Sequence, residues 1–186
     1  MYAADLRTIS AVRNQSPFAF MILTFNLVAL LNVLLAAGGV WTALPEGRGR
    51  AVKLWRLGMP PFFCTMAAIV MLANTPALHV LEAMWLGAAA GGAVIGIIIG
   101  SRVKIRTDQI WGLVHLSPSY IGVICAVGVL VTVLADSTAL WMGFTQWPPG
   151  EDPAIWAALL AGVLDGRGWR MAAKAVGSPH ADLSPD

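Results

Sequence analysis

The chain has 186 residues, of which 58% are apolar and 12% are charged, whereas an average soluble domain is about 45–50% apolar and about 25% charged. Its mean hydropathy is +0.72. The 12 basic and 10 acidic residues leave a net charge of +2, which gives no signal for polyanion binding. This composition excludes a disordered chain, a basic nucleic-acid-binding domain and an ordinary cytosolic enzyme. It predicts an integral membrane protein.

Five apolar stretches predict an all-α polytopic membrane bundle of about five transmembrane helices, because about 20 apolar residues in a helix cross the hydrocarbon core. The stretches are 18–44, 57–73, 76–100, 119–135 and 153–170. The second and third form a tight hairpin, since Asn74-Thr75-Pro76 ends one helix and starts the next. We expect a single transmembrane domain over residues 1–176 and a flexible C-terminal tail over 177–186.

The fifth stretch is the weakest of the five, because it turns polar at Asp165. It crosses the bilayer only if the helix continues through Trp169. Arg167 and Arg170 would then snorkel to the headgroups, with their apolar stems along the helix. A re-entrant or interfacial helix is the alternative.

The basic residues are distributed unevenly over the linkers, which predicts the orientation by the positive-inside rule. Ten of the 12 basic residues fall on one side of the five spans, whereas the loop 136–152 on the other side has acidic residues and no Lys or Arg. We therefore expect the N-terminus outside, and the C-terminus and the loops 45–56 and 101–117 inside. The predicted headgroup-anchoring residues are Arg48, Arg50, Lys53, Arg56, Arg102, Lys104, Arg106, Arg167 and Arg170.

The third span carries a Gly-xxx-Gly-xxx-Gly ridge at Gly92, Gly96 and Gly100. The four-residue spacing places the glycines on one helix face, where small residues let another backbone approach closely in lipid. We interpret the ridge as a packing surface for the fourth or fifth span of the same chain. A homodimer contact is the alternative.

His79 and Glu82 form a candidate polar site at the outer end of the third span, because three residues of separation place both on one helix face. An ionisable residue in a membrane helix is a functional hypothesis by default. An interfacial pair that reaches water or headgroups is the plainer interpretation. Asn26 and Asn32 in the first span are expected to bond neighbouring helices, with a polar pathway as the alternative.

Motifs of known enzyme chemistry do not occur in the sequence. No stretch resembles a phosphate-binding loop, a zinc-protease helix or a serine nucleophile elbow. Cys64 and Cys125 lie in apolar stretches without a histidine at metal-ligand spacing, and we expect both to be small buried hydrophobes. The sequence therefore predicts no catalytic residue, no metal and no cofactor.

Three groups of short motifs follow one another between about positions 47 and 175. The first group is Gly47-Arg48-Gly49-Arg50 with Met59-Pro60-Pro61-Phe62-Phe63 and Met66. The second is 96–100 with Val103-Lys104-Ile105-Arg106 and Val114-His115-Leu116-Ser117. The third is Trp169-Arg170-Met171 with Lys174. In this order and spacing they resemble the CcdC-type membrane protein family. The resemblance implies a small bacterial inner-membrane protein of a family linked by name to cytochrome c biogenesis. The chain departs from the family around 138–152, where its loop is rich in Trp and Pro.

The sequence thus predicts a non-enzymatic, multi-pass membrane protein, and the resemblance implies that it lies in the bacterial inner membrane. We expect a scaffold or assembly factor for a membrane complex, and the resemblance implies a cytochrome-related one. Its expected partners are membrane lipids and another membrane protein, or a second copy at the glycine ridge, and not nucleic acid. A small transporter or channel that uses Asn26, Asn32, His79 and Glu82 is the first alternative, and a cofactor- or pigment-binding subunit is the second.

Overall fold

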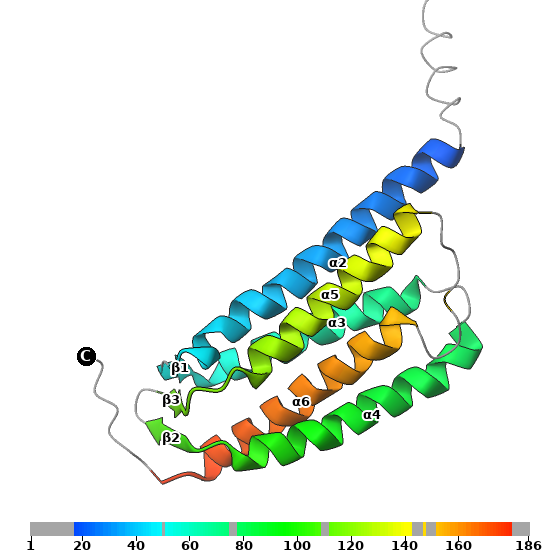
Figure 1. Cartoon of the computed structure of the whole chain (residues 1–186). Coiled ribbons are helices and arrows are strands. Elements are labelled where there is room, and N and C mark those ends of the chain that lie inside the picture. Colours follow the sequence, from blue (N-terminus) through cyan, green and yellow to red (C-terminus); the bar gives the residue numbers. More distant parts are fainter. Residues whose placement is uncertain are drawn as a thin grey trace, which may run out of the picture. The chain divides into compact units, whose positions relative to one another are not determined.

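The computed structural model describes residues 17–49, 51–74, 78–108, 112–142, 147 and 152–179, and the side chains of these residues outside 17–26 and 78–82. The elements are α2 (Pro17–Gly47), β1 (Ala51–Lys53), the 3-10 helix η1 (Leu54–Gly58), α3 (Met59–Ala73), α4 (Leu78–Arg102), β2 (Ile105–Asp108), β3 (Leu113–Leu116), α5 (Ile121–Trp141) and α6 (Pro153–Gly177). The chain divides into two units, Met1–Leu31 and Asn32–Asp186. The second unit contains the last half of α2 and all later elements (Figure 1).

The predicted all-α helical bundle is confirmed, and four helical stretches are long and apolar enough to cross a membrane. Their bounds are Leu27–Gly47, Leu54–Ala73, Ala83–Arg102 and Ile121–Trp141. Large apolar side chains such as Ile97, Ile124 and Val131 stand exposed on these helices, as expected where hydrocarbon is the surrounding solvent. The chain is therefore a multi-pass membrane protein.

The fifth helix, α6, differs from the other four because charged residues lie along it. They are Asp165, Arg167, Arg170 and Lys174. The helices α3, α4 and α5 all pack against α6 (Figure 1), so neighbouring helices cover much of its surface. Helix α6 continues to Gly177, past position 170, where the predicted membrane span ends. Of the predicted tail, residues 180–186 lie outside the described part of the chain.

Helices α4 and α6 run parallel. Gly92 of α4 lies against Leu159 of α6, and Gly96 lies against Val163, so the residue numbers rise together along the contact. This direction is the one expected for the third and fifth helices of a chain that crosses back and forth. It supports the interpretation of α6 as a helix that traverses the bundle rather than one that re-enters.

A three-stranded antiparallel sheet has the order β1-β3-β2. Val114 on the middle strand pairs with Val52 on one side and with Thr107 on the other. The buried face of the sheet packs with Leu57 of η1 and Met171 of α6. The sheet therefore lies at the end of the bundle where α4 and α6 finish (Figure 1).

This sheet corrects the prediction that 45–56 and 101–117 are loops. Strands of three or four residues have little periodic signal, and pairing between distant segments stabilises them. Because β1 pairs with β3, both basic linkers lie at one end of the bundle. Lys174 of α6 joins them by donating to the carbonyl oxygens of Ser101 and Val103.

We expect reporter fusions after Arg56 and after Asp152 to report opposite compartments. Arg56 lies in η1 beside the sheet, whereas Asp152 precedes the start of α6 at the other end of the bundle. The positive-inside rule places the Arg56 fusion in the cytoplasm. A phosphatase and a fluorescent reporter, each active on one side only, make the measurement. The same compartment for both fusions would contradict a five-helix crossing.

Candidate functional site

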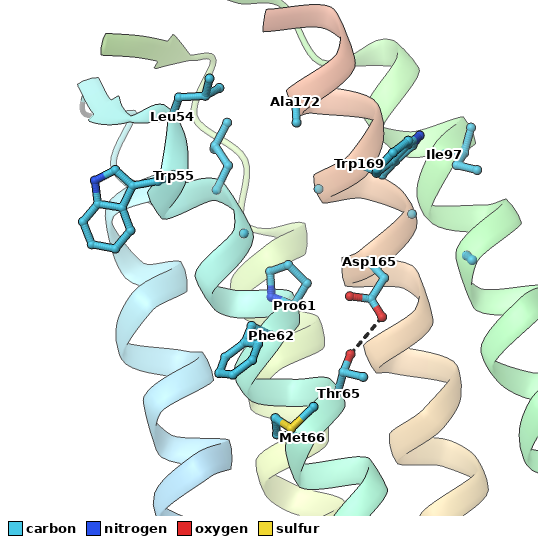
Figure 2. Close-up of a pocket in the computed structure, with 15 residues that line it drawn as sticks. Leu54, Trp55, Pro61, Phe62, Thr65, Met66, Ile97, Asp165, Trp169 and Ala172 are labelled. Carbon is cyan, nitrogen blue, oxygen red and sulfur yellow. Dashed lines mark hydrogen bonds between the residues drawn. The ribbon is translucent and has the colours of Figure 1, made fainter. Parts of the chain in front are cut away.

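A groove opens on the side of the bundle between η1 and α3 on one wall and α4 and α6 on the other (Figure 2). Its volume is about 710 Å³, within the range of about 300–1,000 Å³ typical of ligand sites. Trp55, Phe62 and Trp169 are its large aromatic side chains, and most other lining residues are apolar or small. The groove is the candidate site because two polar residues interrupt this apolar lining.

The two polar residues in the lining are Thr65 and Asp165. The Thr65 hydroxyl donates to Asp165 Oδ2 at 2.8 Å, which links α3 to α6 across the groove (Figure 2). Asp165 is exposed to the groove, and no basic side chain within the described ranges forms an ion pair with it. Its second carboxylate oxygen, Oδ1, thus remains available to a hydrogen-bond donor from outside.

Asp165 lies deep along the bundle. It is the middle residue of α6, about 18 Å from Pro153 and from Gly177 at 1.5 Å per residue. It is level with Gly96, which lies about 9 Å before the end of α4 at Arg102. Ionisable side chains at such depth are expensive, and those that are kept face a cavity or a partner. The sequence marked Asp165 only as a polar break, because Thr65, its partner, is 100 residues away.

A buried ion pair lies on the opposite face of α6. Arg167 Nη1 donates to Glu46 Oε2 at 2.7 Å, and the two side chains are 3% and 5% exposed. Gly122 of α5 leaves the space for this pair, since a Cβ there would lie 2.7 Å from Arg167 Nη1. Two residues along a helix turn the side chain by about 200°, which separates Arg167 from the groove that Asp165 faces.

The predicted role of Arg167 in anchoring headgroups is therefore wrong. Glu46, at the end of α2, gives the guanidinium a partner inside the bundle, and burying a charge is tolerable when such a partner compensates it. The other predicted anchors within the described residues are exposed. They are Arg48, Lys53, Arg56, Arg102, Lys104, Arg106 and Arg170. Arg50 lies outside the described residues.

The glycine ridge of α4 lies against α6. A Cβ at Gly92, Gly96 or Gly100 would be 2.1, 2.1 or 3.0 Å from a backbone carbonyl oxygen of α6. Helix α6 presents Gly162 and Gly166 to α4 in the same way, at 2.2 and 2.0 Å from carbonyl oxygens of α4. The two backbones are in direct contact, as small residues permit in membranes, so a helix of the same chain covers the face that a second copy would need.

Of the remaining polar candidates, Asn32 is the one whose side chain lies within the described residues. Asn32 is buried, and its Oδ1 has no hydrogen-bond partner among the described residues. His79 and Glu82 lie on α4, but their side chains, like that of Asn26, fall outside the described residues. In the part of the chain that the structure describes, no cluster of three or more His, Cys, Asp or Glu could hold a metal ion.

Comparison with family models, curated proteins and solved structures found no match to this chain. The similarity to CcdC-type proteins therefore rests on the short motifs alone and stays a prediction. What the protein does has to be inferred from the groove and its chemistry.

Proposed function

We propose that the protein is a non-enzymatic accessory factor that assists the assembly of a membrane complex by receiving a transmembrane helix of another protein in the groove. The observation that carries this proposal is the Asp165 carboxylate, bonded to Thr65 in an otherwise apolar groove that opens sideways. Hydrocarbon offers a carboxylate no hydrogen bond, so leaving Asp165 against lipid is unfavourable. A partner that covers Asp165 and donates a hydrogen bond removes this penalty and therefore binds more tightly.

The lining of the groove supports a helix as the occupant. Gly58 and Ala172 are small lining residues, and no described atom lies within 4 Å of a Cβ built at Gly58, so a second backbone can come close there. Trp55 and Trp169 stand exposed at the basic end of the groove, and aromatic side chains are enriched at protein interfaces. The predicted resemblance to a family linked by name to cytochrome c biogenesis also supports an assembly role, for a cytochrome-related complex.

A photo-reactive amino acid at Phe62, introduced into the full-length protein in its native membrane, tests this proposal. Phe62 lines the groove and is 55% exposed, whereas Val131 on α5 is 57% exposed and lies outside the groove. Val131 is therefore a matched control position. We expect one discrete protein to be cross-linked from Phe62 and not from Val131, and reciprocal purification of that protein to recover this chain.

Two results would contradict the proposal. One is the same set of cross-linked proteins from Phe62 and Val131, which would mean random contact in the bilayer. The other is lipid adducts alone at Phe62, which would mean that the groove takes acyl chains and no helix.

A further inference from the structure

We propose that the helix received by the groove carries a lysine or arginine that pairs with Asp165 inside the membrane. This inference rests on the proposed function, because it names the chemistry of the partner at that site. The Asp165 carboxylate is the one acidic group in the groove lining. The hydrogen bond from Thr65 comes from a neutral donor, so it orients the carboxylate and leaves its charge uncompensated.

No basic residue in the described part of the chain forms an ion pair with Asp165. Arg167, two residues after Asp165, turns to the opposite face of α6 and binds Glu46. Arg56 at the basic end of the groove lies over the Trp55 ring, 5.6 Å from its centroid. Attraction between opposite charges is strongest where water is excluded, so an external ammonium or guanidinium is the complement that fits Asp165 best.

The depth of the pairing position follows from the contact between α4 and α6. Gly96 packs against Val163 and Arg167, which flank Asp165, so Asp165 is level with Gly96. Gly96 lies six residues before Arg102, the last residue of α4, which is about 9 Å at 1.5 Å per residue. The basic residue of the partner helix therefore belongs about 9 Å inside the end of the bundle where the sheet lies.

A phospholipid fits this position less well than a helix does. Acyl chains cannot donate a hydrogen bond to Oδ1, and the lipid groups that can, such as an ethanolamine ammonium, belong at the headgroup level and not about 9 Å inside the end of the bundle. A transmembrane helix can hold an ammonium or guanidinium at a fixed depth, and intramembrane charges in proteins pair with one another in this way.

Synthetic peptides test the inference with the full-length protein in phospholipid nanodiscs. The host peptide is a helix of about 20 leucines with terminal solubilising residues, and one position at the depth of Asp165 carries Lys, Leu or Glu. The photo-reactive group at Phe62 captures bound peptide. We expect the Lys peptide to half-saturate capture at about one tenth of the concentration that the Leu peptide needs, and the Glu peptide to bind worst. Capture from Val131 should not distinguish the three peptides.

Variants of the groove identify the group of the protein that recognises the charge on the peptide. Asp165→Asn keeps the shape and should abolish the preference for Lys, while Asp165→Glu and Thr65→Val keep a carboxylate and should retain it. If Asp165→Asn does not fold, the order of the three peptides on the parent protein decides the question. Equal capture of Lys and Leu peptides, or a preference that survives Asp165→Asn, would overturn the inference. In that case a native partner cross-linked at Phe62 would still uphold the proposed function.

Discussion

Replacing Arg167 by methionine is expected to destabilise the folded bundle by about 3–5 kcal/mol, the usual cost of leaving a buried charge without its partner. The pair is 2.7 Å apart, with side chains 3% and 5% exposed, so Glu46 would keep its burial and lose its compensation. Heating the purified protein in mild detergent with a thiol reagent makes the measurement. Cys64 and Cys125 are both free and buried, so their reaction reports unfolding.

Two controls separate the loss of pairing from the loss of a large side chain. The double variant Glu46→Leu with Arg167→Met should recover most of the stability, because replacing an entire buried ion pair by apolar residues is often neutral or stabilising. Arg170→Met, at an exposed position of the same helix, should change stability by no more than about 0.5 kcal/mol. An Arg167→Met protein as stable as the parent would show that the pair does not hold α2 to α6.

Gly96→Leu is expected to abolish the close packing of α4 on α6 and to lower the yield of folded protein. A Cβ at this position already lies 2.1 Å from the carbonyl oxygen of Val163 and 2.8 Å from the amide nitrogen of Arg167. Overpacking typically costs about 1–3 kcal/mol and sometimes more. Because both obstacles are backbone atoms that cannot rotate away, we expect a cost at the upper end. Size-exclusion chromatography of the detergent-solubilised protein measures the folded yield.

Gly91 provides the matched control on the same helix. No atom lies within 4 Å of a Cβ built at Gly91, so Gly91→Leu adds the same side chain to α4 without a clash and should leave the yield unchanged. Equal losses of folded yield in both variants would mean that leucine disturbs α4 itself rather than its packing against α6. An unchanged folded yield for Gly96→Leu would mean that the glycine face contacts lipid rather than α6.

These two contacts explain how the groove is held open. Helix α6 carries the glycine contact with α4 on one face, the ion pair with Glu46 on another, and Asp165 on the face toward α3. The first two contacts position the α6 backbone on either side of Asp165. The carboxylate is therefore held at one depth along the bundle.

The sequence by itself determined the features that depend on local composition. Long apolar stretches mark helices because a bilayer demands about 20 such residues, and the four-residue spacing of Gly92, Gly96 and Gly100 predicts one packing face whatever the partner. The uneven distribution of basic residues also predicted that the two linkers share one side, and the pairing of β1 with β3 places them at one end of the bundle.

Only the tertiary structure decided what each charged residue of α6 does. In the sequence, Asp165, Arg167 and Arg170 are three charged residues at the end of a weak apolar stretch, and their local context does not separate their environments. In the folded chain Asp165 faces Thr65 in a groove, Arg167 is buried against Glu46, and Arg170 is exposed. The partners of Asp165 and Arg167 are 100 and 121 residues away, and the free energy of a charge in a membrane protein depends on the group opposite it. Local spacing contains no information about that group, since only the packing of α6 against α2 and α3 brings it there.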